Sequence, residues 1–69
     1  MKLSARNLLK GKVLEVKRGQ TTAHVKLDVG NGIVITSSIT MEALDELKLK
    51  QGDAAYAVIK ASDVILGID

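Results

Sequence analysis

The absence of cysteine is the feature that most constrains how this chain can fold. A domain of 69 residues buries only about 60% of the surface that its unfolded chain exposes, so small domains usually depend on disulfides, a structural metal or oligomerisation. The sequence contains no cysteine and one histidine, His24, which excludes disulfides and a metal site with thiolate ligands. The fold therefore requires either an unusually good core or self-association.

The apolar side chains are almost all aliphatic. Hydrophobic residues make up 46% of the chain, yet Tyr56 is its only aromatic residue. One small core cannot hide this much apolar surface, and exposed apolar surface favours association between subunits. We therefore expect an oligomer.

The basic residues are concentrated in the first part of the chain. Residues 1–26 carry seven basic side chains and one acidic one (net +6), whereas residues 27–69 carry three basic and seven acidic ones (net −4), which together give the formal charge of +2. This asymmetry indicates an anionic partner or a complementary neighbour in an assembly. No apolar run reaches the ~18 residues of a membrane span, and the first residues lack the apolar segment of a signal peptide. We expect a cytoplasmic protein.

Hydrophobic alternation predicts a mainly β fold. Residues 22–29 alternate apolar and polar side chains, which is typical of a half-buried strand, and Gly30-Asn31-Gly32 favours a hairpin turn after it. Further strands are expected over 8–18 and 33–39, and two short ones over 54–68. Thr40 is suited to cap a short helix over 41–49. This order predicts a five-stranded OB-like barrel with one short helix between the third and fourth strands.

Catalytic chemistry is poorly represented in the sequence. Nucleophilic catalysis needs a base beside the nucleophile, and the only imidazole, His24, lies on the polar face of a predicted strand. Carboxylates gather on the predicted helix, where a solvated face is their ordinary role. We therefore expect a protein that is not an enzyme.

Three short clusters of hydrogen-bond donors suit a small tetrahedral oxyanion. Such an ion is bound by convergent hydroxyls, backbone N–H groups and cations. Ser and Thr are also common in turns and strands, so each cluster alone has an ordinary structural interpretation. The strongest candidate ligands are Ser4, Ala5, Arg6, Lys60 and Ser62; weaker candidates are Asn7, Thr36, Ser37, Ser38 and Ala61.

These clusters stand in longer motifs that are found together in one family. With SARNLLKGKV at 4–13, ITSSIT at 35–40 and LDELKLKQGDAAYAVIKASDVILG at 44–67, the chain resembles the small molybdate-binding proteins called molbindins, or Mop proteins. The resemblance covers nearly the whole chain and indicates a single Mop domain over 1–69. One departure is Leu8, where family members often have glutamine, so a side-chain role at this position is not carried over.

The resemblance implies a function and an assembly. It implies an OB-like barrel that forms a homohexamer, a trimer of dimers, with molybdate or tungstate bound at subunit interfaces and stored or buffered in the cytoplasm. By position, Ser4, Ala5 and Arg6 would bind the oxyanion together with Lys60 and Ser62 of a neighbouring subunit. The amide of Asn7 and the hydroxyls of 36–38 are candidates for a second class of site on a symmetry axis.

Two alternatives and one other role for Arg6 stay open at this point. An OB-fold with a basic half could bind nucleic acid, although a single tyrosine offers no stacking platform for bases. An anion-sensing regulatory domain is also compatible with the sequence, although no DNA-reading helix is present. Arg6 could instead pair with a carboxylate such as Asp63, because arginine serves both in anion binding and in ion pairs.

Overall fold

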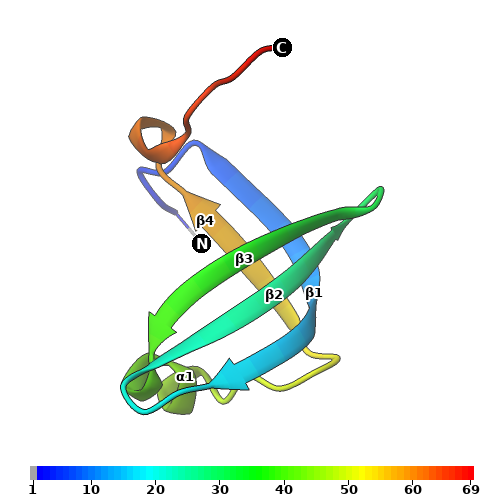
Figure 1. Ribbon diagram of the computed structural model, residues 1–69. Helices are drawn as coiled ribbons and strands as arrows, with labels where there is room; N and C mark the ends of the chain where they lie inside the picture. The colour runs from blue at the N-terminus through cyan, green and yellow to red at the C-terminus, as the bar shows by residue number, and fades with distance from the viewer. Residues whose placement is uncertain (1) are drawn as a thin grey trace.

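The fold is a curled antiparallel sheet of four strands with one short helix. The computed structural model describes residues 2–69. The elements follow in the order β1 (Asn7–Arg18), β2 (Thr22–Gly30), β3 (Ile33–Thr40), α1 (Met41–Leu47), β4 (Ala54–Ile59) and a 3-10 turn, η1 (Ala61–Asp63). Within the sheet the strand order is β3-β2-β1-β4, so β3 and β4 are its two edges (Figure 1).

The longest strand, β1, pairs with two neighbouring strands in the curled sheet. Its first half pairs with β4 and its second half with β2, and the register shifts between Val13 and Glu15. At Gly11 the backbones of β1 and β2 lie so close together that a Cβ at this position would collide with the backbone carbonyl of Asp28. A glycine there lets β1 change partner without leaving the sheet.

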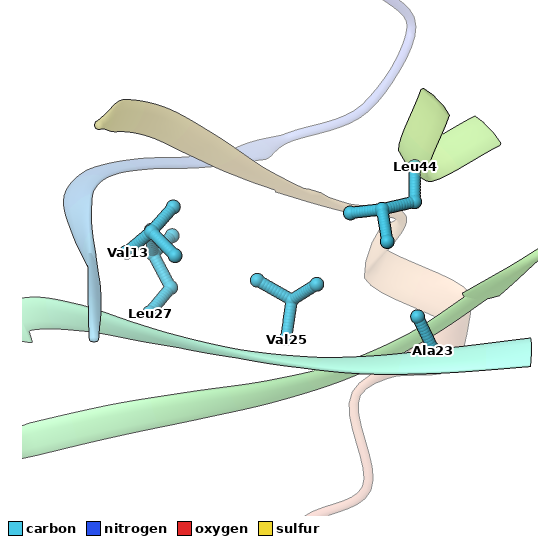
Figure 2. Packing of buried hydrophobic residues seen from close by; sticks show 5 residues of the cluster. All are labelled: Val13, Ala23, Val25, Leu27 and Leu44. Atoms are coloured by element: carbon cyan, nitrogen blue, oxygen red, sulfur yellow. The ribbon is translucent and has the colours of Figure 1, made fainter. Parts of the chain in front are cut away.

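The core lies on the concave side of the sheet and is small. Five hydrophobic residues are buried: Val13, Ala23, Val25, Leu27 and Leu44. Figure 2 shows their side chains pointing into one common space, with Leu44 entering from the helix. Three of the five come from β2, whose alternation of buried and exposed positions confirms the half-buried strand expected from residues 22–29.

The helix α1 closes one end of the barrel and follows the predicted capping. The Thr40 hydroxyl accepts a hydrogen bond from the backbone N–H of Ala43 at 3.0 Å, as an N-cap residue should. The helix ends at Leu47, and its C-cap residue Lys48 takes a left-handed conformation with φ 53°. The short helix after the third strand is therefore confirmed. No helix within residues 2–69 is long and apolar enough to cross a membrane.

The count of five strands is not confirmed. Residues 54–59 form β4, but the chain then turns through η1, and residues 64–69 have no sheet partner. A strand exists only where another strand accepts its backbone hydrogen bonds. Within residues 2–69 no such strand lies beside this segment, although its sequence has the composition of one. The barrel consequently stays open between β3 and β4.

Candidate anion-binding site

The pairing of β1 with β4 brings two of the three donor clusters to the same corner. Asn7 is the first residue of β1 and lies opposite Ile59, the last residue of β4. The Asn7 side-chain amide donates a hydrogen bond to the Ile59 carbonyl at 3.1 Å. The residues before Asn7 and those after Ile59 therefore leave the sheet side by side, which places Ser4–Arg6 next to Lys60–Ser62.

The turn after β4 presents the second cluster on the surface. The backbone N–H of Asp63 donates to the Lys60 carbonyl at 2.9 Å, and that of Val64 donates to the Ala61 carbonyl at 3.3 Å. These bonds hold the turn, while the side chains of Lys60 and Ser62 stay exposed. The turn therefore holds one ammonium group and one hydroxyl group at the surface.

The first cluster is exposed in the same way. Ser4 and Arg6 are exposed, and Ala5 and Asn7 are half-buried. Asn7 commits one amide hydrogen to Ile59, so its structural role is clear and only its second hydrogen is left for a ligand. The small Ala5 leaves the backbone around it approachable.

The cations at this corner are not neutralised by carboxylates. Within residues 2–69 the ion pairs are Arg18 with Asp45 at 3.5 Å and Lys26 with Glu15 at 4.0 Å. Arg6 forms no pair with Asp63 in this structure, and Lys60 also lacks a carboxylate partner among the described residues. Two unneutralised cations beside hydroxyl groups attract an anion.

The third donor cluster lies elsewhere. Thr36, Ser37 and Ser38 belong to β3, the opposite edge of the sheet from β4. Thr36 and Ser37 line a groove that runs between β3 and β4. The structure therefore does not join this cluster to the corner within one chain.

A cation site is not found. In the part of the chain that the structure describes, residues 2–69, no three His, Asp or Glu side chains gather where they could hold a metal ion. The donor set of the corner, with its hydroxyl, ammonium and guanidinium groups, suits an anion and repels a cation.

The groove between β3 and β4 was not predicted from the sequence. The groove between β3 and β4 has a volume of about 440 Å³ and is lined mostly by aliphatic side chains. The signal that could have indicated it is the apolar sequence of residues 64–68, which the structure leaves without a partner.

Comparison with known proteins identifies the family. The family model for the TOBE domain matches residues 3–66. This chain belongs to the TOBE family. The resemblance of this TOBE chain to Mop proteins is also confirmed by its relatives. It is 46% identical, over the whole length of both chains, to a probable molybdenum-pterin-binding protein of Haemophilus influenzae.

Two solved structures support the same relationship. MopII from Clostridium pasteurianum superposes on this TOBE chain with a TM-score of 0.91 at 43% identity, covering 97% of this chain and all of the other. The cytoplasmic molybdate-binding protein ModG, solved with molybdate bound, gives a TM-score of 0.96 at 51% identity. The match covers all of this chain and 49% of the ModG chain.

Proposed function

We propose that this chain is a molybdate-binding protein without catalytic activity, built as a single Mop domain over residues 1–69. The observation that carries the proposal is the corner where Ser4–Arg6 lies beside Lys60–Ser62, held by the bond between Asn7 and Ile59. The names of the relatives, which describe proteins that bind molybdate or molybdenum-pterin, support molybdate as the ligand.

Each donor at the corner has a role toward a tetrahedral dianion. The hydroxyls of Ser4 and Ser62 and the backbone N–H groups beside Ala5 supply short hydrogen bonds to separate oxygens. Arg6 and Lys60 balance the two negative charges, and charge-assisted hydrogen bonds of this kind are about twice as strong as neutral ones. The corner thus contains the donor types that the ion requires.

A neighbouring subunit completes the site in this proposal. The side chains of Ser4, Arg6, Lys60 and Ser62 are exposed, so one chain alone leaves the anion largely in water, where electrostatic attraction is weak. In a two-fold contact the same patch faces itself, so each chain's first cluster meets the other chain's second cluster. Because both clusters lie at one corner, such a contact forms two equivalent sites. We extend this assembly to a homohexamer, a trimer of dimers.

Selectivity against phosphate follows from how the proposed ligands direct their hydrogens. Phosphate carries a proton near neutral pH, and that proton needs an acceptor. Backbone N–H groups, Arg6 and Lys60 offer none, so only a lone pair of the Ser4 or Ser62 hydroxyl could receive it. Where both hydroxyls direct their hydrogens to the anion, the proton stays unsatisfied at a cost of about 1–3 kcal/mol. Molybdate and tungstate carry no proton and are accepted alike. Sulfate also lacks a proton, so only the size of the cavity discriminates against it.

The proposed biological role is to store or buffer molybdate in the cytoplasm. An anion that bridges subunits stabilises their assembly by mass action. Binding and oligomerisation are therefore linked, and the protein should release its anion when the free concentration falls.

Isothermal titration calorimetry with molybdate tests the proposal directly. The oligomeric state is first determined by light scattering, and sulfate and phosphate serve as control ions. We expect heat with molybdate, saturation at a defined ratio to subunits, and no heat with phosphate. No heat with molybdate, or equal binding of all three ions, would refute the proposal. Single-stranded nucleic acid would then be the next ligand to test.

The same titration on the Arg6→Ala variant tests whether Arg6 belongs to the binding site. It removes one cation from the corner and should weaken molybdate binding while leaving the fold unchanged. Lys12→Ala is the matched control, because it removes the same charge from the middle of β1, where Lys12 is exposed. Equal molybdate affinities of the two variants would show that Arg6 does not contribute to the site.

A further inference from the structure

A second cluster of basic side chains lies at the other end of β1 from the anion-binding corner. Lys17 and Arg18 are the last two residues of β1, and Thr22 and His24 lie in the first part of β2. Together with Gly19 they line a pocket of about 170 Å³ beside the turn between the two strands. We call it the turn pocket. Figure 1 shows this turn next to α1, away from the start of β1.

The register of the sheet places Lys17 and His24 side by side. They are direct partners in the pairing of β1 with β2, and directly opposed residues of antiparallel strands have Cβ atoms about 4.5–5.5 Å apart. Ala23 and Val25, the neighbours of His24 along β2, are buried in the core, so the imidazole belongs to the outer face of the sheet. Both side chains are exposed. One anion can therefore contact the ammonium and the imidazole group together.

The charges around the turn pocket favour an anion. Its lining includes no carboxylate from residues 2–69. Arg18 pairs with Asp45 of α1 at 3.5 Å, and Lys26 pairs with Glu15 at 4.0 Å, so these four charges are balanced in pairs. Lys17 has no carboxylate partner in the described part of the chain. Its ammonium group is thus available to a ligand.

The backbone around the turn pocket is held in place by hydrogen bonds. The Gly19 N–H donates to the Thr22 carbonyl at 2.9 Å, and the Met41 N–H donates to the Thr21 carbonyl at 3.0 Å. A Cβ on Gly19 would lie 2.8 Å from the Thr22 carbonyl oxygen, so this close approach of the two strands requires glycine. Because the turn is already ordered, an ion that binds there has to order only side chains.

We propose that the turn pocket is a second anion site, which binds one small divalent oxyanion through Lys17, Thr22 and the protonated imidazole of His24. The two cations supply charge-assisted hydrogen bonds, and the hydroxyl supplies a neutral one. Two positive charges match an ion with two negative charges, such as sulfate or molybdate. All three ligands come from one chain, so this site needs no neighbouring subunit. It shares no residue with the corner and does not depend on the proposed function.

Histidine gives the site a dependence on pH. Its side chain ordinarily gains a positive charge as the pH falls from roughly 8 to 5, whereas lysine is charged throughout this range. His24 faces Lys17 from β1 and the uncharged Ser38 from β3. Its charged neighbours Lys26 and Glu15 are paired with each other. We therefore expect the anion to bind more tightly as the pH falls.

Proton NMR of the imidazole tests the site, because His24 is the only histidine in the chain. Its ring signals are followed through a pH titration of the full chain, once in sodium sulfate and once in sodium chloride at equal ionic strength. An ion that prefers the protonated ring moves the midpoint of the titration to higher pH. Binding about tenfold tighter to the protonated form moves it by about one pH unit at saturation. Identical midpoints in the two salts would overturn the inference.

Two lysine variants locate the effect of sulfate. Lys17→Ala removes one ligand of the turn pocket and should abolish most of the shift that sulfate causes. Lys12→Ala is the matched control, because it removes the same charge from an exposed position of the same strand that does not line the pocket. Equal sulfate-dependent shifts in the two variants would show a general effect of charge and would contradict the proposed site.

Equilibrium dialysis of sulfate provides a second measurement. The wild-type chain should bind more sulfate at about pH 6 than at about pH 8, and His24→Gln should remove this difference. A difference that persists in His24→Gln would overturn the inference. The corner contains no histidine, so a chain that shows this pH dependence but gives no heat with molybdate near neutral pH would refute only the proposed function.

Discussion

Asn7 and Ile59 are 52 positions apart in the sequence and are joined by a hydrogen bond of 3.1 Å, from the side-chain amide of the first to the backbone carbonyl of the second. This bond ties the start of β1 to the end of β4. It therefore aligns the two donor clusters that flank these strands. The bond has a structural role in the chain. Under the proposed function, the same alignment positions the ligands of the anion.

Replacement of Asn7 by alanine should affect stability and binding together. Loss of one half-buried hydrogen bond costs about 1 kcal/mol of unfolding free energy, and the two clusters lose their common anchor. We expect a small decrease in the urea midpoint and a larger relative decrease in molybdate affinity. Gln20→Ala, at an exposed loop position, is the control for loss of a carboxamide. Wild-type affinity in Asn7→Ala would show that the anchor does not position the site.

Subunit mixing should reveal that each site is shared. Arg6→Ala and Lys60→Ala are each expected to weaken molybdate binding. If a site takes Arg6 from one chain and Lys60 from another, random mixing of the two variants restores about a quarter of the sites, because only those combine both wild-type residues. Titration of the mixture, with exchange of subunits verified by mass spectrometry, measures the recovered fraction. No recovery would place both residues of a site in one chain.

Leu44 should be far more important for stability than Leu47, although both lie on α1. Leu44 is completely buried, whereas Leu47 is 62% exposed. Leucine-to-alanine replacement in a core costs about 2–5 kcal/mol, a large fraction of the stability of a domain this small. Thermal unfolding followed by circular dichroism should show a strong decrease for Leu44→Ala and little change for Leu47→Ala. Similar effects of the two variants would mean that assembly buries Leu47 as well.

Replacement of Gly11 by alanine should destabilise the protein even though alanine usually stabilises a chain. At a tolerant position the change gains about 0.4–1 kcal/mol, by restricting the unfolded state. At Gly11 the new Cβ would meet the Asp28 carbonyl, whereas at Gly67 it would meet nothing within 4 Å. Chemical denaturation should therefore give a lower midpoint for Gly11→Ala than for Gly67→Ala. The reverse order would show that β1 and β2 can separate at this crossing without cost.

The local parts of the fold could be read from the sequence. The alternation over 22–29 correctly indicated the buried face of β2, and Gly30, Asn31 and Gly32 all have positive φ in the hairpin turn. Thr40 was identified as the cap of the helix because capping depends only on residues a few positions apart. These features are determined by neighbours in the sequence.

The predictions that were not confirmed concern features that depend on residues far apart in the sequence. The segment 64–69 has the composition of a strand, but composition does not say whether a strand edge is within reach, and in one chain none is. The proximity of Ser4–Arg6 to Lys60–Ser62 depends on the register between β1 and β4, which follows from closure of the whole sheet. The resemblance to Mop proteins supplied the grouping of these residues that spacing alone could not.

The strand order also bears on the time course of folding. β1, β2 and β3 form a meander of successive neighbours, whereas the β1–β4 pair joins segments from opposite ends of the chain. Contacts between nearby segments form before distant ones, because closing a longer loop costs more entropy. We expect β4 to dock last during folding. A newly synthesised chain would then form the corner proposed to bind the anion only in its final folding step, so that under this proposal anion binding would report a completely folded molecule.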